Sequence, residues 1–299
     1  MTQMACDVVG IGENSVDVVY RLPAPLAANV KMPISGGAVR PGGQVATTLC
    51  TCARLGLRSR YIGTFGSDDH AALIRTALES YGVDTGSALV RQAPNRYAVI
   101  LVEEATGDRT VLWRRDAALT LRIGDIEPAL ITDARLLHVD DVDEEASIAA
   151  AEIARAAGVQ VTTDIDHVSS HTGRLIDAAT CAILAEPVAS ALTGEKDPER
   201  AVRALRQRHG TMVCVTLGGR GAMLLDGDRL HRVDPHAVEV VDTTGAGDVF
   251  RGALIDALLR GDAPEDMLRF ANAAAAISCT RGGAIGGVPT RREIEDLMG

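Results

Sequence analysis

Short hydrophobic runs alternate along the chain with longer segments in which hydrophobic residues recur every three or four positions. The short runs are rich in β-branched residues and are typical of buried strands, whereas the longer spacing is typical of amphipathic helices. Regular alternation of the two predicts βαβ units and a parallel sheet. The expected strands are residues 5–11, 61–65, 136–139, 159–163, 181–184, 212–217, 222–225 and 239–241. The expected helices are residues 45–55, 70–80, 144–157, 175–179, 189–192, 198–209, 249–259 and 267–278.

Two segments interrupt this rhythm. Residues 14–40 and 95–115 are rich in turn formers and short strand patterns, and residues 97–103 and 109–114 read as a hairpin around a Thr-Gly-Asp turn at 106–108. We expect the two segments to form a small β-sheet lid over one end of the core. The α/β core then consists of residues 1–13, 41–94 and 116–299.

The composition is that of a globular protein with an aliphatic core, because 46% of the residues are hydrophobic and only 3% are aromatic. The net charge of −10 repels nucleic acid phosphates and anionic lipid. The six cysteines include no CxxC pair, which favours buried thiols in a reducing compartment. Neither a signal peptide nor a membrane-spanning run is recognisable. We therefore expect a cytoplasmic protein without nucleic acid or membrane partners.

The most informative segment is VVDTTGAGDVFRGA, residues 240–253. A β-branched run leads into a Gly-Ala-Gly turn and then into a helix with apolar residues at helical spacing. Glycines at a helix start let backbone N–H groups approach a ligand, and the helix dipole favours an anion there, phosphate above all. Asp248 in such a site is suited to take a proton from a hydroxyl that attacks the phosphate. The alternative is that Asp248 only caps the helix.

The heptapeptide DTTGAGD at 242–248 closely resembles the second signature of the ribokinase family of carbohydrate kinases, also called the PfkB family. PGGQVAT at 41–47 resembles the first signature, and FGSDD at 65–69 resembles a further family segment. The resemblance covers essentially the whole chain. It implies a three-layer α/β/α ribokinase-like core with a small β-sheet lid, and an ATP-dependent sugar kinase. By this resemblance Asp248 is the general base, and the N–H groups of Gly245, Ala246 and Gly247 hold charge on the transferred phosphoryl group.

The resemblance also implies a sugar site. Asp17 matches the acidic residue that the family uses to bind sugar hydroxyls, with a solvated loop acid as the alternative. Asp141 lies near a second acidic ligand of ribokinases, although a solvated acidic turn explains it almost equally well. Gln44 and Thr47 replace residues common in the family, which leaves the sugar open. The expected substrate-binding set is Asn14, Asp17, Gly42, Gly43, Gln44, Thr47, Asp141 and Asp248.

The nucleotide site is implied by the segment TLGGRG, which resembles the T-x-G-x-x-G segment beside the ATP phosphates and ribose. This assigns Thr216, Gly218 and Gly221 to ATP, and Asn272 to the lining of the adenine pocket.

The cation sites are implied less directly. The family's N-x-x-E motif, which organises Mg²⁺ and phosphates, is absent, because Ala185 and Val188 stand at its positions. Glu186 is the expected substitute in a shifted register. The resemblance also implies a loop for a monovalent cation, with potassium as the expected activator. Its residues are Asp242, Thr244, Ser278, Arg281, Gly283 and Gly287.

Three further interpretations stay open. A nucleoside kinase uses the same scaffold, although the scarcity of aromatic residues near residues 17–47 favours a sugar. A catalytically impaired sensor is suggested by the lost N-x-x-E motif. An anionic substrate is suggested if Arg114 or Arg115 points into the site. As in ribokinase relatives, we expect a homodimer that forms through the lid strands.

Overall fold

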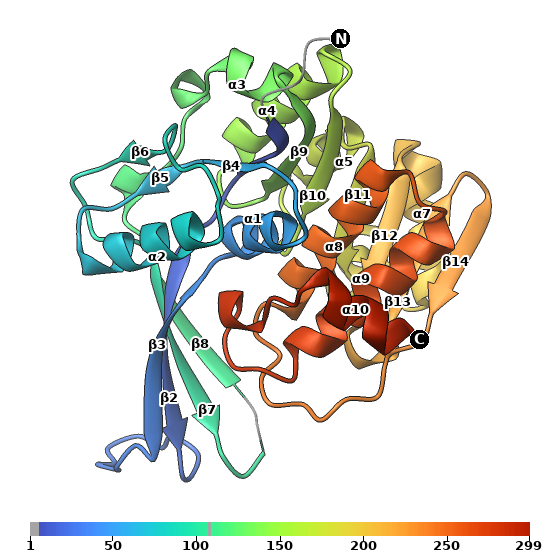
Figure 1. Cartoon of the computed structure of the whole chain (residues 1–299). Coiled ribbons are helices and arrows are strands. Elements are labelled where there is room, and N and C mark those ends of the chain that lie inside the picture. Colours follow the sequence, from blue (N-terminus) through green and yellow to red (C-terminus); the bar gives the residue numbers. More distant parts are fainter. Residues whose placement is uncertain (1–5, 107–108) are drawn as a thin grey trace.

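The computed structural model describes residues 6–106 and 109–299 and consists of a large α/β core from which a small sheet projects (Figure 1). The core sheet has eight strands in the order β14-β13-β12-β11-β10-β9-β1-β4. The six strands from β12 to β4 are parallel, and β13 and β14 extend the sheet as antiparallel neighbours. The bounds are β1 Cys6–Ile11, β4 Ser59–Ile62, β9 Ala134–Asp140, β10 Gln160–Asp164, β11 Cys181–Ala185, β12 Met212–Thr216, β13 Ala222–Asp226 and β14 Arg229–Val233.

Helices cover both faces of this sheet, and each face has its own hydrophobic cluster. Alternate strand residues face opposite clusters: Val8 lies in the first and Val9 in the second. The three-layer core is therefore confirmed. The first cluster includes residues of α1 (Gln44–Arg54), α2 (Asp69–Ser80), α8 (Ala246–Arg260), α9 (Pro264–Ser278) and α10 (Arg291–Met298). The second includes residues of α3 (Pro128–Thr132), α4 (Glu144–Ala156), α5 (Thr172–Ala178), α6 (Glu186–Thr193) and α7 (Pro198–His209).

The expected strand at 239–241 does not form, and this prediction is wrong. Its backbone has another partner: the N–H groups of Val241 and Asp242 donate to the carbonyl of Cys279 at the end of α9. Residues 234–245 instead form an irregular connection to α8. The expected strand at 61–65 is divided at Gly63, because β5 (Thr64–Phe65) leaves the large sheet to pair with β6 (Leu89–Val90).

The small sheet has the order β3-β2-β7-β8. In Figure 1 it projects from the core as an arm below α2. Of the expected turn at 106–108, residues 107–108 lie outside the described residues. Strand β3 continues two residues beyond the expected segment 14–40. The bounds are β2 Ser15–Leu22, β3 Gly36–Gly42, β7 Tyr97–Glu103 and β8 Arg109–Arg114.

The remaining regular elements are short 3₁₀ turns at Ala117–Leu119, Ile123–Asp125, Gly218–Arg220 and Ile285–Gly287. In the described part of the chain, no helix has the length and apolar character needed to cross a membrane. All six cysteines are unpaired, and only Cys279 is partly exposed.

Candidate active site

Buried acidic residues gather at the carboxyl edge of the parallel sheet. Asp140 and Asp164 are the last residues of the neighbouring strands β9 and β10, and Glu13 follows β1, which pairs with β9. The N-termini of α1 and α8 approach the same edge, since Thr48 of α1 donates its hydroxyl to the carbonyl of Asp248. Open α/β sheets bind ligands at this edge, where strands end and helices begin.

The turn before α8 needs its glycine. Gly245 precedes the helix with a φ of 78°, and a Cβ atom there would lie 2.5 Å from the Cβ of Ala284. The helix begins at Ala246, and Asp248 is the acidic residue of its first turn. The first N–H groups of a helix have no partner within it. Together with the dipole they make this turn suited to an anion.

A buried charged cluster lies beneath the turn. Arg251, one helical turn after Asp248, places its Nη1 3.7 Å from that residue's Oδ1 and its Nη2 2.5 Å from Oδ1 of Asp164. The side chains of Arg251 and Asp164 are 4% and 0% exposed. Burial raises the pKa of Asp248 well above its usual value, and the neighbouring charge of Asp164 adds to the shift, while Arg251 opposes it. Arg251 and Asp164 are thus buried together, whereas the side chain of Asp248 is 15% exposed.

The substrate side of the edge is formed by β2 and the loop before α1. Asp17 is 9% exposed, and burial raises its pKa to about 6 although Arg96 lowers it. Gly42 leaves room for this carboxylate, because a Cβ there would lie 2.6 Å from the Oδ2 of Asp17. Gly43 has a φ of 102° and lies against the backbone of Asn14. Both glycines are needed for this close approach of the loop and β2.

Four other predicted substrate residues already have roles within the protein or are buried. Asn14 donates to the hydroxyl of Tyr61 and to the carbonyl of Thr64. Asp141 accepts the N–H groups of residues 166 and 167 through one carboxylate oxygen. Gln44 donates to Asp166, and Thr47 is fully buried. Of the predicted acids, the side chain of Asp248 is 15% exposed, and Asp17 is 9% exposed.

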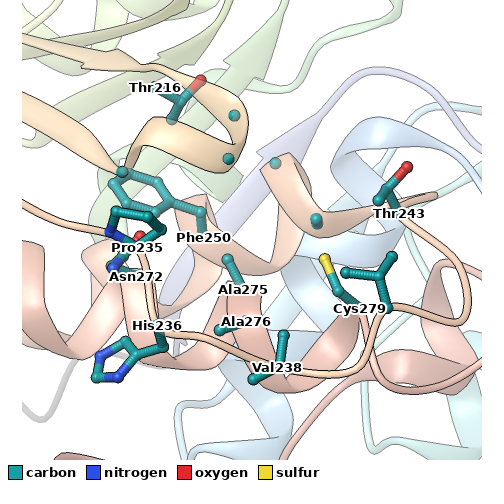
Figure 2. A pocket seen from close by; sticks show the side chains of 16 residues that line it. Thr216, Pro235, His236, Val238, Thr243, Phe250, Asn272, Ala275, Ala276 and Cys279 are labelled. Atoms are coloured by element: carbon teal, nitrogen blue, oxygen red, sulfur yellow. The ribbon is translucent and has the colours of Figure 1, made fainter.

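A cavity of about 350 Å³ lies on the other side of the α8 N-terminus (Figure 2). The predicted residues Thr216, Gly218, Gly221 and Asn272 all line it, and so do Ala246 and Gly247 of the turn. Four residues that the sequence did not single out for a ligand complete much of the wall: Pro235, His236, Val238 and Phe250. The cavity therefore ends at the proposed anion site.

Glu186, the expected substitute for the missing motif, is already paired. It begins α6 directly after β11, and the register places its neighbour Ala185 opposite Thr216. Its carboxylate forms an ion pair with Arg220 of the TLGGRG segment. The expected substitute for the missing motif is thus close to the predicted phosphate segment.

The expected cation loop is brought together from two segments. Asp242 accepts the N–H of Thr244 on one carboxylate oxygen and the N–H of Gly283 on the other. Ser278 donates to its own helix, and Arg281 pairs with Glu293 of α10. The N–H of Gly287 donates to the carbonyl of Gly283, which closes the second segment. Among the described residues, no group of three His, Cys, Asp or Glu side chains is arranged to hold a metal ion. A cation here would need backbone carbonyl ligands.

Comparison of the chain with known proteins identifies its family. Residues 6–291 match the pfkB family of carbohydrate kinases. The chain belongs to this family. The expectation of an ATP-dependent carbohydrate kinase with a ribokinase-like fold is thereby confirmed.

Relatives of this pfkB chain include plant fructokinases. Fructokinase-2 of Oryza sativa subsp. japonica is 28% identical over 97% of this chain and 93% of its own length. Among solved structures, a ribokinase from Thermotoga maritima has a TM-score of 0.86 at 26% identity, covering 98% of this chain and 99% of its own. Arabidopsis thaliana ribokinase complexed with ribose and ATP has a TM-score of 0.87 at 25% identity, covering 99% of both chains.

The pfkB chain also contains site residues that the sequence did not indicate. Arg251 and Asp164 were not assigned a role, yet they surround Asp248. Two signals were present: Arg251 interrupts a run of apolar residues at the start of α8, and Asp164 ends a buried strand. Glu13 and its partner Arg96, whose Nε lies 2.6 Å from Oε1 of Glu13, come from distant segments, so their pairing has no local signal.

Proposed function

We propose that this kinase transfers the γ-phosphoryl group of ATP to a hydroxyl of a neutral sugar, with Asp248 as the general base. The observation that carries the proposal is the position of Asp248 in the first turn of α8, between the nucleotide cavity and the acids of the sheet edge. Asp248 takes the hydroxyl proton as the sugar oxygen bonds to phosphorus and the bond to the ADP oxygen breaks. The N–H groups of residues 245–247 stabilise the charge on the phosphoryl oxygens.

A neutral substrate is supported by the pairing of the nearby arginines. Arg96 pairs with Glu13, and Arg115 donates to Asp143 at 2.6 Å and to the carbonyl of Leu119. Arg114 is exposed on the edge strand β8. Neither Arg114 nor Arg115 is thus available as a buried anion ligand. The carboxylate of Asp17 favours hydroxyl groups and repels a sugar phosphate or sugar acid.

ATP is assigned to the 350 Å³ cavity, with its phosphates towards residues 245–247 and 218–221. The Glu186–Arg220 pair at the end of β11 is the proposed organiser of Mg²⁺, which would neutralise charge on the ATP phosphates. The carbonyl oxygens of the loop that contains Asp242, Thr244, Ser278, Arg281, Gly283 and Gly287 would hold potassium next to the anion site. Oxygen is the ligand type that such hard cations take.

A nucleoside is the second candidate substrate because of one observation. Cross-strand pairing places Trp113 of β8 on the same face of the small sheet as Asp17, through Ala98 of β7. Its indole is 64% exposed, and an exposed indole can stack on a base. Trp113→Ala distinguishes the two: it should abolish turnover of a nucleoside and leave turnover of a sugar within about threefold.

The decisive test is ADP release with ATP and Mg²⁺ over a panel of ketoses, aldoses, sugar acids, sugar phosphates and nucleosides, with and without potassium. Asp248→Asn should bind ATP and keep its fold, but lose about 10² to 10⁴ in turnover because the base is gone. Near-normal turnover in this variant rules out the assigned base. Stabilisation by a sugar without ADP release from the parent chain would instead support the sensor.

A homodimer through the lid is supported by the second face of the small sheet. Val39 and Leu112 are 53% and 55% exposed, and both pair with residues of the row opposite to the Asp17 row. Exposed apolar faces of this kind mark protein interfaces. Leu112→Glu should convert a dimer to a monomer in light scattering. Val111→Glu, one residue away on the other face, is the matched control and should leave the assembly unchanged.

The proposed location is cytoplasmic, since the described thiols are unpaired. Unpaired thiols are typical of reducing compartments.

A further inference from the structure

The charged side chain of Arg251 is buried. Its side chain is 4% exposed on α8, which is otherwise lined with buried apolar residues around this position. The guanidinium lies directly under the turn, because a Cβ on Gly247 would meet Nη1 of Arg251 at 2.7 Å. A charge is held in such a place only when it is paired. The pairing partners therefore indicate what the arginine does.

Those partners are the carboxylates nearest to the proposed site of chemistry. The guanidinium contacts Asp164 at 2.5 Å, Asp248 at 3.7 Å and Asp166 at 4.0 Å. The side chain of Asp166 is 47% exposed and accepts a hydrogen bond from the side-chain amide of Gln44 at 2.8 Å. One fork-shaped cation thus links the base with two acids of the neighbouring strand end, which the single point charge of a lysine does poorly.

The remaining charged groups that face the pair come from every surrounding element. Glu13, after β1, adds negative charge near Asp248, and Asp141, after β9, adds it near Asp164. His138 of β9 is fully buried, and burial lowers its pKa to about 3, with Arg251 as a further cause, so it is neutral. The thiol of Cys214 on β12 is also held in its neutral form by burial, which raises its pKa. Among the contacts described here, Arg251 is the one arginine that lies within 4.0 Å of Asp164, Asp166 and Asp248.

We propose that Arg251 is a positioning residue that keeps the carboxylate of Asp248 ionised and oriented for proton abstraction, with Asp164 as the acid that sets the strength of this effect. The inference rests on the proposed role of Asp248 as base. Arg251 itself lies beneath the turn and does not reach the cleft. Asp164 competes for the same guanidinium, and its negative charge disfavours a second charge on Asp248.

Substitutions of Arg251 and of Asp164 should shift the acid limb of the pH profile in opposite directions. Removing the cation makes Asp248 harder to ionise, so the acid limb of the pH profile moves to higher pH. When the charge of Asp164 is removed, Arg251 interacts mainly with Asp248, and a repelling negative charge is lost. Asp248 then ionises more easily, so the acid limb moves to lower pH. A merely structural disturbance lowers activity in both variants without moving the limb in opposite directions.

The experiment compares kcat against pH for the parent chain, Arg251→Gln, Arg251→Lys and Asp164→Asn. Arg251→Gln should move the acid limb up by at least one pH unit and lower kcat at least tenfold below the limb, with KM for ATP within threefold. The acid limb of Arg251→Lys should lie between those of Arg251→Gln and the parent chain. Asp164→Asn should move the limb down. Arg291→Gln removes another arginine that pairs with a buried acid of α8, Asp256, and should keep the parental limb.

A second measurement separates failure of this inference from failure of the proposed function. The difference in unfolding free energy between the chain and its Asp248→Asn variant, followed by urea unfolding over pH, reports the titration of Asp248 without any turnover. The midpoint of this titration should lie at least one pH unit higher in the Arg251→Gln background, and between this value and the parental one in the Arg251→Lys background. An unchanged midpoint overturns the role of Arg251, whatever the substrate. A shifted midpoint in a chain that releases no ADP would support the role of Arg251. It would contradict only the proposed phosphoryl transfer.

Discussion

Arginines pair with acidic residues on two sides of the turn at residues 242–248, and the two places differ in burial. Beneath the start of α8, Arg251 and Asp164 are 4% and 0% exposed. On the outer side of the same turn, Arg40 of the small sheet lies 3.7 Å from Asp242, and the two are 38% and 21% exposed. Arg109 of β8 reaches the same loop by donating to the hydroxyl of Thr244 at 2.9 Å.

The burial of each pair determines how strongly it stabilises the site. An exposed ion pair contributes about 0 to 1 kcal/mol because water competes for both charges. Breaking a buried pair leaves an uncompensated charge and lowers stability by about 3 to 5 kcal/mol. The buried pair in the core therefore holds Asp248 in place. The contacts between the small sheet and the loop of Asp242 can be lost at a small cost in free energy.

The largest effect is expected from Arg251→Gln. The free energy of unfolding at pH 7 should fall by about 3 to 5 kcal/mol, because Asp164 is left fully buried without its counter-charge. Urea unfolding measures the loss. The double variant with Asp164→Asn removes both charges and should recover at least half of it. If the double variant is less stable than Arg251→Gln alone, the two residues are not coupled as the geometry indicates.

The sequence predicted features that depend on residues close together in the chain. It did not predict contacts between distant segments. The βα alternation and the Gly-Ala-Gly turn predicted the core and the start of α8, because side-chain period and glycine conformation act within a few residues. The strand expected at 239–241 failed because its N–H groups bond to Cys279, about forty positions away. The Arg251–Asp164 contact joins a helix to a strand 87 residues earlier, so only the fold reveals it.

An intermediate effect is expected at Glu13, whose pair with Arg96 is less exposed than that of Arg40. The side chains of Glu13 and Arg96 are 8% and 18% exposed. Burial raises the pKa of Glu13 to about 7, although Arg96 opposes the shift. Because the folded chain holds this proton more tightly than the unfolded one, its contribution to stability is complete below about pH 4.5 and is lost as the pH rises through about 7.

Glu13→Gln keeps the neutral shape and removes this titration. Relative to the parent, the variant should gain stability as the pH rises from about 4.5 to 7, by a total of about 2 to 3 kcal/mol. Urea unfolding at half-unit steps of pH checks the curve. The exposed control Glu199→Gln, whose pair with Arg203 lies on α7, should run parallel to the parent. A flat difference between Glu13→Gln and the parent would mean that Glu13 stays ionised in the folded chain.

The smallest effect is expected from Arg40→Ala. Its guanidinium packs on Gly282 and Gly283 and faces Asp242, but water reaches both partners. The free energy of unfolding should fall by less than about 1 kcal/mol, and the difference should shrink between 0.05 and 0.5 M salt as screening increases. A loss above about 2 kcal/mol that is insensitive to salt would place this contact with the buried pair. The small sheet would then be fixed to the loop of Asp242, and substrate entry would require a route that does not separate them.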